Sequence, residues 1–431
     1  MAAFTIAFLQ KHGNAVLCRG DLMKRKILLL VCDGLGDRPS PELGGRTPLQ
    51  AAVKPNIDAL ARKAMHGLIY TLSPGVVPGS DTSHLSLLGY EPQGFYTGRG
   101  PFEALGAGMK LNRGDIAFRC NFATVDAHGV VTDRRAGRIR EPETAELASL
   151  VSDMRIDGAH VRFRESTEHR CVLVIGGKGL GADVSDTDPG VTGMPLQLSK
   201  GKDAASAKTA RILNKFTEIA HTSFAESAVN RERTARGLPP ANAVAARSGG
   251  VYPSIEPFSE KHGLTFGAVA AEGLIKGLCA ALGGEVVTPP GATAGMDTDL
   301  RAKGRAALAM LNEKDFVLVH VKPTDIAGHD GNARGKVDIL QKVDAMVGEI
   351  MNSAGDNTVF AITGDHSTPV SAKEHTCDPV PVMIYAAGLR SDGISSFDEI
   401  SSSAGSLTWL RGIELMPLLK GYAGRTEKYG A

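Results

Sequence analysis

The chain has 431 residues, of which 42% are hydrophobic and 22% are charged, and its formal net charge is +1. Such a composition is typical of a globular protein, and the length predicts two or three domains. The balanced charge argues against a nucleic-acid partner or a membrane-surface partner, and no apolar run reaches the roughly 18 residues that a membrane span requires.

The six cysteines are widely scattered and include no C-x-x-C pair. This distribution favours a reducing compartment, the cytoplasm, and argues against a structural zinc site. Residues 1–22 contain a short apolar stretch but no basic start and no convincing cleavage site of a secretory signal. We expect residues 1–23 to be a disordered N-terminal extension.

Two elements are predicted before residue 70. The stretch KRKILLLVCDG (24–34) is an apolar run ended by Asp-Gly, which is typical of a buried parallel strand. The stretch KPNIDALARKAMHG (54–67) is predicted as a helix, with Pro55 at its start, Met65 on its apolar face and Gly67 just past its end.

The next segment, VPGSDTSHLSLLGY (77–90), places a hydroxyl and a carboxylate at the start of a short helical pattern. Ser80 or Asp81 is suited to cap the helix, and Gly89 to end it in the left-handed conformation. A helix N-terminus also favours anions, so Ser80 is equally placed to be a nucleophile that receives a phosphoryl group. His84 lies within the apolar pattern and is interpreted as a packing residue.

The middle of the chain, residues 111–240, is more polar and richer in arginine than its flanks. We interpret it as a substrate-binding α+β domain inserted into a core formed by residues 24–110 and 241–431. Two glycine-rich stretches, 98–108 and 176–183, lack the spacing of a P-loop or of a dinucleotide fingerprint and are interpreted as turns. No nucleotide site is therefore expected.

Apolar runs like the one at 24–34 recur at 315–322, 357–365 and 380–386 and predict further buried strands. A helix is predicted at 335–355, between two of them. Strands that alternate with helices predict an α/β fold, with a mostly parallel sheet covered by helices on both faces.

Carboxylates and imidazoles follow three of these core strands, and a further imidazole lies just before the strand at 380–386. They are Asp33, Asp325, His329, Asp365 and His366, and then His375. Each one alone is more simply explained as a turn or surface residue. Ligands in open α/β sheets lie beyond the carboxyl ends of the strands, so the six groups are expected to converge on one edge. Clustered carboxylates and imidazoles need a cation among them, and six ligands fit two divalent ions better than one tetrahedral site.

Four arginines in the middle segment are candidate anion clamps, because guanidinium groups match phosphate or carboxylate bidentately. They are Arg119, Arg134, Arg135 and Arg138. For any one of them, an ordinary salt bridge on a solvated surface is the competing interpretation.

Taken together, ten stretches resemble the archaeal-type 2,3-bisphosphoglycerate-independent phosphoglycerate mutases of the alkaline phosphatase superfamily. In order between residues 24 and 386, they are VCDGLGDRP, PGSDTSHLSLLGYEP, GRGPFEALGAG, RCNFATVD, DRRAGR, GLPPANA, DTDLRAKG, HVKPTDIAGHDGN, GDHSTP and EHTCDPVPVMI. Two departures from the family pattern, Cys120 in place of a glycine and Gly364 in place of an alanine, remove no ligand.

The resemblance implies an alkaline phosphatase-like core interrupted by a substrate-binding domain, with Ser80 as the residue that carries the phosphoryl group. It implies two divalent ions, of manganese, magnesium, zinc or cobalt, and neither nucleotide nor 2,3-bisphosphoglycerate as cofactor. Lys322 is implied to touch the phosphoryl oxygens. One ion is implied to be held by Asp33, Ser80, Asp365 and His366, and the other by Asp325, His329 and His375.

The implied activity is that of an isomerase of glycolysis and gluconeogenesis, which interconverts 3-phosphoglycerate and 2-phosphoglycerate through a phosphoserine. The expected partner is therefore a small phosphorylated substrate. Three alternatives remain open from the sequence. They are an ATP-dependent phosphotransferase such as a homoserine kinase-like enzyme, a metal-dependent phosphatase or sulfatase, and a non-catalytic binding protein with the same fold.

Overall fold

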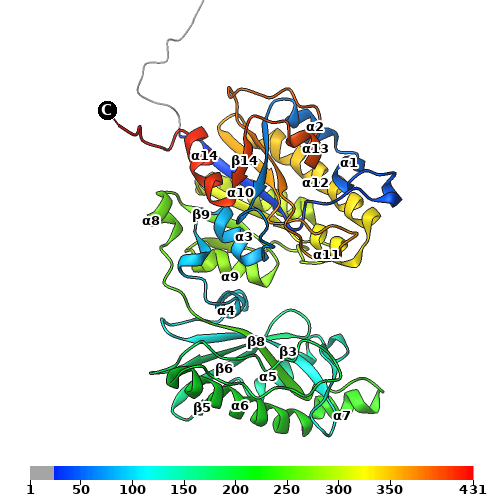
Figure 1. The fold of residues 1–431 in the computed structure, drawn as a ribbon, viewed down its shortest axis with the longest axis vertical. Coiled ribbons are helices and arrows are strands. Elements are labelled where there is room, and N and C mark those ends of the chain that lie inside the picture. The colour runs from blue at the N-terminus through cyan, green and yellow to red at the C-terminus, as the bar shows by residue number, and fades with distance from the viewer. Residues whose placement is uncertain (1–23, 431) are drawn as a thin grey trace, which may run out of the picture.

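The computed structural model describes residues 24–430, so the extension expected at residues 1–23 lies outside the described part of the chain. The chain forms two lobes, each built on its own β-sheet (Figure 1). No helix among the described residues is both long and apolar enough to cross a membrane.

The larger lobe contains an eight-stranded sheet. Its strands, in spatial order, are β10 (Glu285–Val287), β9 (Phe266–Val269), β11 (Phe316–Val321), β1 (Lys26–Cys32), β12 (Thr358–Thr363), β13 (Val380–Tyr385), β2 (Met65–Tyr70) and β14 (Thr408–Arg411). Neighbouring strands are parallel except at β13, which runs antiparallel to both β12 and β2. The mostly parallel sheet expected from the sequence is confirmed.

Both faces of this sheet are covered, which explains why its central strands are continuously apolar. In β1, Ile27 and Leu29 pack into one apolar cluster while Leu28 and Leu30 pack into another on the opposite face. The first face carries α3 (Ser80–Leu87), α8 (Phe258–His262), α9 (Gly273–Ala281) and α14 (Leu415–Tyr422). The second face carries α1 (Pro48–Ala51), α2 (Pro55–Ala61), α10 (Leu300–Glu313) and α12 (Ala333–Ala354), and α13 (Glu399–Ser402) contacts β13 and β2.

The helix predicted at 54–67 is shorter than expected, because α2 ends at Ala61 and the chain enters β2 at Met65. Met65 is therefore a buried strand residue, and Gly67 does not end a helix. A Cβ on Gly67 would lie 2.8 Å from the carbonyl oxygen of Thr408 in the neighbouring strand β14. Gly67 is therefore required by the close approach of two strands. In the sequence alone, a glycine at this position looks like the end of a helix.

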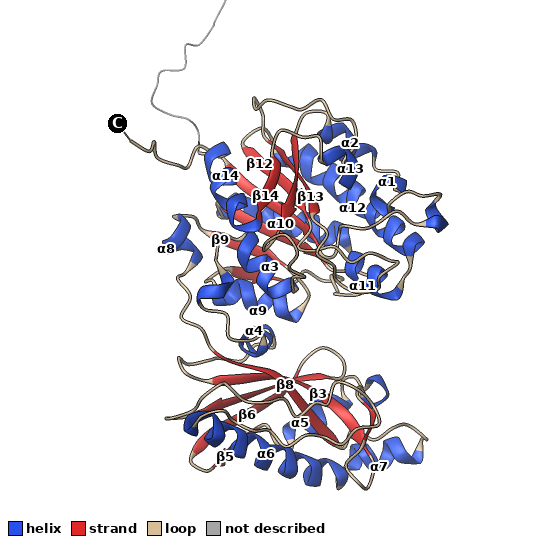
Figure 2. Cartoon of the chain, viewed as in Figure 1, coloured by secondary structure: helices blue, strands red, loops and turns tan. Residues whose placement is uncertain are grey.

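The smaller lobe contains a six-stranded antiparallel sheet. Its strands are β4 (Val131–Asp133), β3 (Ile116–Val125), β7 (Arg170–Gly176), β6 (Ala159–Glu165), β5 (Asp153–Ile156) and β8 (Ala243–Val251), the last of which pairs with β3. Helices α5 (Glu143–Ser149), α6 (Ala204–Ala225) and α7 (Ala228–Ala235) lie on one side of this sheet (Figure 2). The α+β character expected of the inserted segment is thus observed.

Strand β8 lies beyond residue 240, where the sequence placed the return to the core. Its first residues are apolar and resemble a strand of the larger sheet, but they pack in the core of the smaller lobe instead. We therefore propose that the inserted domain extends from 111 to 251.

Residues 98–108 form helix α4 (Gly100–Gly106) rather than the expected turn, and this helix lies between the two lobes (Figure 1). Its backbone contacts both neighbours closely. A Cβ on Gly277 of α9 would collide with the Phe102 carbonyl oxygen, and a Cβ on Gly100 would collide with the Ala117 carbonyl oxygen of β3. The glycines of this stretch thus allow close packing of one helix against both lobes.

Candidate active site

The six predicted ligands meet at one edge of the larger sheet. Asp33 directly follows β1, and Asp325 lies on α11 (Pro323–Asp330), immediately after β11. Asp365 follows β12 by two residues. His375 precedes β13, and because this strand is antiparallel, its beginning lies at the same edge as the ends of its neighbours. The topology therefore brings together groups that are far apart in sequence.

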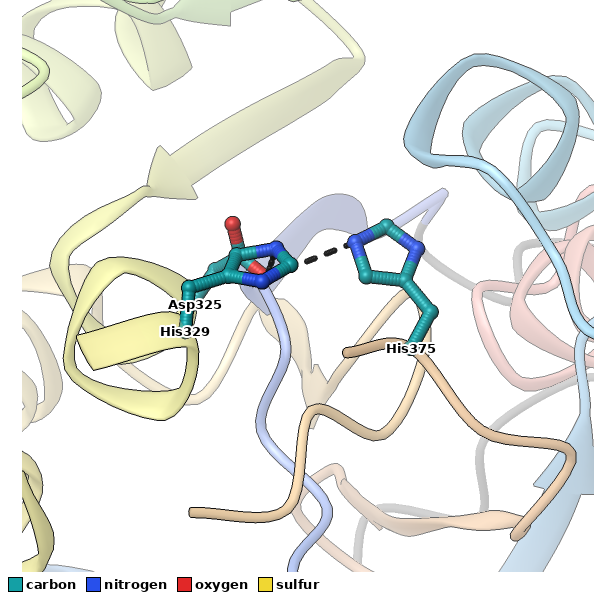
Figure 3. Close-up of side chains that lie close together, drawn as sticks. All are labelled: Asp325, His329 and His375. Carbon is teal, nitrogen blue, oxygen red and sulfur yellow. Dashed lines mark ion pairs between the residues drawn. The ribbon is translucent and has the colours of Figure 1, made fainter. Parts of the chain in front are cut away.

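One half of the site consists of Asp325, His329 and His375 (Figure 3). The Oδ1 atom of Asp325 lies 3.4 Å from Nε2 of His329 and 3.6 Å from Nε2 of His375. The Nδ1 atoms of both rings face backbone carbonyl oxygens, of Lys373 at 2.8 Å and of Pro78 at 2.9 Å. These bonds orient both Nε2 atoms toward the carboxylate, as in metal-binding histidines.

The other half is centred on Nε2 of His366. This atom lies 3.3 Å from Asp33 Oδ1, 3.3 Å from Asp365 Oδ2 and 3.1 Å from Ser80 Oγ. The carboxylate of Asp325 also lies within 4.8 Å of ligand atoms of Asp33 and His366, so it borders both halves. The structure thus brings all six predicted ligands and Ser80 into one cluster.

The donor set fits a divalent cation. The Oδ1 atom of Asp33 and the Oδ2 atom of Asp365 are buried and have no hydrogen-bond partner among the described residues. A buried carboxylate oxygen is costly unless a cation or donor compensates it. Lys322 supplies a single ammonium for this cluster, at 3.1 Å from Asp33 and 2.6 Å from Asp325. Carboxylate and imidazole groups suit zinc, manganese and similar ions.

The electrostatics keep the carboxylates ionised. Burial raises the pKa of Asp33, but the Lys322 ammonium and the nearby His320 and His366 outweigh burial and hold this pKa well below its usual range. Burial and Asp33 raise the pKa of Asp325, yet Lys322 again lowers it overall. Burial lowers the pKa of His366, whereas Asp365 and Asp33 raise it above its usual value. The acids are therefore in the form that binds a cation.

Ser80 is the first residue of α3, and its hydroxyl does not cap the helix. The N-cap is Gly79, while Asp81 accepts a hydrogen bond from the Thr82 N–H at 2.9 Å. The hydroxyl of Ser80 instead faces His366 at the helix N-terminus, where the backbone N–H groups favour an anion. The capping interpretation is therefore wrong for Ser80, and its role as a nucleophile stays a prediction.

The sequence missed several supporting residues. Nε2 of His320, in β11, lies 2.9 Å from Asp33 Oδ2, and the Thr368 hydroxyl donates to Asp325 Oδ1 at 2.8 Å. Nδ1 of His84 lies 2.7 Å from the Ser80 carbonyl oxygen and 3.5 Å from Asp365 Oδ2, so His84 borders the site instead of only packing. His320 could have been noticed in the sequence because it is the one polar residue in the apolar strand FVLVHV.

Arginines gather on the side of the smaller lobe that faces α4. Arg119, in β3, and Arg99, just before α4, both pair with the buried Glu103, at 3.5 Å and 3.0 Å. Burial and the neighbouring arginines Arg99, Arg247 and Arg170 lower the pKa of Arg119 to about 9. The neighbouring arginines add to the effect of burial, and such a group of guanidinium side chains suits an anionic ligand.

The other three predicted clamps differ in their surroundings. Arg134 forms a bidentate pair with Asp188, at 3.2 Å and 2.8 Å. Arg135 is exposed but lies near enough to His169 to contribute to lowering its pKa to about 4, after burial and Arg170. Arg138 is exposed on a turn with a positive φ of 57°. Arg99, Arg170 and Arg247 were not predicted as anion clamps. Arg99 lies in the stretch GRGPFEALGAG, whereas none of the family stretches contains Arg170 or Arg247.

A cleft of about 900 Å³ lies between the lobes. Lys322 and Glu272 line it from the larger lobe, and Arg170 and Arg164 line it from the smaller one. The cleft therefore connects the ligand cluster with the arginine-rich face and has room for a small charged molecule.

The sequence model of 2,3-bisphosphoglycerate-independent phosphoglycerate mutase matches residues 61–230. A phosphoglycerate mutase of this type from Methanopyrus kandleri is 46% identical over 95% of this chain and 99% of the relative. One from Metallosphaera sedula is 46% identical over 95% of this chain and 100% of the relative.

Two solved structures are similar as well. A protein from Pyrococcus horikoshii has a TM-score of 0.84 and 36% identity, covering 95% of this chain and all of that one. The cofactor-independent phosphoglycerate mutase of Thermoplasma acidophilum has a TM-score of 0.70 and 38% identity, covering 93% of this chain and all of that one. The chain therefore belongs to the family of 2,3-bisphosphoglycerate-independent phosphoglycerate mutases.

Proposed function

We propose that the protein is an isomerase that interconverts 3-phosphoglycerate and 2-phosphoglycerate without 2,3-bisphosphoglycerate, a step of glycolysis and gluconeogenesis. Family membership supports the reaction. One geometric observation carries the assignment to particular residues, which is the placement of the Ser80 hydroxyl at 3.1 Å from His366 within a buried cluster of carboxylates and imidazoles.

The same cluster supports a site for two divalent metal ions. Asp33, Ser80, Asp365 and His366 would hold one ion, and Asp325, His329 and His375 would hold the other. Manganese, magnesium, zinc and cobalt are the candidate ions. When bound, such ions lower the pKa of a hydroxyl and stabilise negative charge on a transferring phosphoryl group.

The chain's own residues then perform a transfer in two steps. The Ser80 oxygen attacks the phosphorus of 3-phosphoglycerate, and the bond from phosphorus to the C3 oxygen breaks. Glycerate stays in the cleft and reorients until its C2 hydroxyl attacks the phosphoserine, which releases Ser80. The N–H groups at the start of α3 and the Lys322 ammonium stabilise the phosphoryl charge in both steps.

The arginine-rich face supplies the binding of glycerate. Arg119, Arg134 and Arg135 were proposed from the sequence, and the structure adds Arg99, Arg170 and Arg247 as neighbours of Arg119 and Arg134. Guanidinium groups bind carboxylates bidentately and so retain glycerate between the two transfers. The inserted lobe also shields the phosphoserine from water, which otherwise would hydrolyse it. Arg138 stays a prediction from the sequence alone.

One experiment tests the reaction class. The purified full-length protein, supplied with Mn²⁺ and 3-phosphoglycerate but no nucleotide, is expected to form 2-phosphoglycerate, followed by ³¹P NMR. Release of inorganic phosphate without 2-phosphoglycerate would identify a phosphatase. No reaction until ATP and an alcohol acceptor are added would identify a phosphotransferase.

A further inference from the structure

Lys336, on α12, is completely buried, with a relative exposure of 0%. Lysine is rarely found so deep in a protein, because its ammonium loses its hydration. Lys336 lies outside the proposed ligand set and outside the arginine-rich face, and the proposed transfer steps do not use it. Its position therefore requires another explanation.

The ammonium of Lys336 has three acceptors. Its Nζ lies 2.7 Å from Asp37 Oδ2, 3.0 Å from the Thr368 carbonyl oxygen and 3.3 Å from the Gly36 carbonyl oxygen. Each of the three N–H groups of the ammonium therefore has an acceptor oxygen. The side chain of Asp37 is as fully buried as that of Lys336.

These acceptors belong to two loops that carry proposed ligands. Gly36 and Asp37 follow Asp33, and Thr368 follows Asp365 and His366. The loops also bond directly to each other, since the Thr368 N–H donates to the Gly36 oxygen at 3.1 Å.

The third segment is the one that holds Lys336 itself. Helix α12 begins at Ala333, directly after α11, which carries Asp325 and His329. One ammonium therefore joins the three segments that provide five of the seven proposed ligands.

We propose that Lys336 is a positioning residue that fixes these three segments in the arrangement that binds metal. This inference rests on the proposed function, because it takes the metal centre as given. Stability alone does not account for the residue, since a buried ion pair replaced by apolar groups is often no less stable. Residues that orient metal ligands without touching the metal typically contribute 10–100-fold to affinity.

The test is a titration of the metal-free full-length protein with Mn²⁺, measured by calorimetry. Lys336→Met is expected to bind Mn²⁺ about 10–100-fold more weakly than the wild type. The matched control is Lys54→Met, which removes another buried lysine paired with an aspartate, the partly exposed Asp58 at 2.9 Å on helix α2. The control is expected to keep the wild-type affinity.

Lys336→Met leaves the buried carboxylate of Asp37 without a cation, which can impair folding. A second variant avoids this problem. Combining Lys336→Met with Asp37→Asn removes both charges and keeps an oxygen for the Val370 N–H, which donates to Asp37 at 3.1 Å. The double variant is expected to fold, by circular dichroism, and still to bind Mn²⁺ at least 10-fold more weakly.

Wild-type affinity in either folded variant overturns the inference and leaves the proposed function intact. An equal loss in Lys54→Met also overturns it, because the effect would then follow from general destabilisation. A wild-type protein that binds no Mn²⁺ overturns the proposed metal centre, and the role of Lys336 with it.

Discussion

The two sides of the cleft are built differently. On the larger lobe, the ligand cluster follows the ends of buried strands and is held by backbone bonds, such as that between His375 and the Pro78 carbonyl oxygen. On the smaller lobe, the arginines come from β3, β7, β8 and the start of α4, and they pair with scattered acids such as Glu103 and Asp188.

The difference reflects what each side must do. Phosphoryl transfer requires fixed groups around one hydroxyl, and short loops after parallel strands provide that rigidity. Retaining glycerate while it turns requires positive charge distributed over a surface instead of a single fixed contact. We therefore expect substitutions on the larger lobe to abolish turnover, and substitutions on the smaller lobe to weaken substrate binding.

Ser80→Ala is the most severe test of the larger lobe. Without the hydroxyl no phosphoserine forms, so kcat is expected to fall by about a millionfold, as for nucleophiles of other covalent enzymes. The conversion of 3-phosphoglycerate is measured by ³¹P NMR, and circular dichroism checks the fold.

Ser83→Ala is the matched control, because Ser83 lies on the same helix and its hydroxyl contacts Thr71 at 3.1 Å, away from His366. It is expected to retain activity. Turnover by Ser80→Ala within tenfold of the wild type would remove Ser80 from the nucleophile role.

Removal of metal by a chelator tests the same side more broadly. Activity is expected to disappear and the melting temperature to fall, because a ligand present at a thousand times its Kd contributes about 4 kcal/mol to the free energy of unfolding. Re-addition of Mn²⁺ should restore both quantities. Chelator already saturated with metal is the control, and full activity in protein shown to be free of metal would contradict the two-ion site.

The same contrast explains what could be predicted from the sequence. Five of the six candidate ligands are predictable because an apolar run is followed by Asp-Gly, by Asp-His or by a nearby D-x-x-x-H pair, and His375 is predictable because it lies just before the next apolar run. Arg170 and Arg247 lie on antiparallel strands, where only the sheet pairing places them beside Arg119. No local pattern records that pairing.

Helix α4 was missed for a related reason. Gly100 of α4 allows the close contact with Ala117, and Gly277 of α9 allows the contact with Phe102 of α4, which only the packed structure shows. In the sequence the glycines of 98–108 indicate a turn instead. We propose a domain boundary beyond residue 240 because the apolar start of β8, which resembles a strand of either sheet, pairs with β3 of the smaller lobe.

Arg119→Met is the corresponding test of the smaller lobe. Loss of one charged hydrogen bond to substrate costs about 1.5–3 kcal/mol, so kcat/KM is expected to fall roughly 10–100-fold, mainly through a higher KM. Steady-state kinetics in both directions measure the effect. Arg211→Met is the control. Arg211 lies on α6 and forms an exposed ion pair with Asp157, so its loss should leave kcat and KM unchanged. A fall in kcat alone would place Arg119 with the transfer machinery instead.

The last expected effect concerns the dependence of stability on pH and the surroundings of His169 in the smaller lobe. Burial and the neighbouring Arg170, Arg135 and Arg119 lower the pKa of His169 to about 4, against an ordinary value of 6.5. Between these two values the unfolded chain binds more protons than the folded one, so stability rises with pH. Acidification from pH 6.5 to 4 is expected to remove up to about 3 kcal/mol of stability through this group.

His169→Gln keeps a polar side chain but cannot titrate, so its stability should depend less steeply on pH over this window. Urea unfolding at several pH values measures the difference, and His128→Gln, at an exposed position of the same lobe, is the control. Equal slopes for the wild type and His169→Gln would mean that neither burial nor the neighbouring arginines hold the pKa of His169 below its ordinary value. The positive charge that the smaller lobe offers to glycerate would then have to be tested at the arginines themselves, as in Arg119→Met.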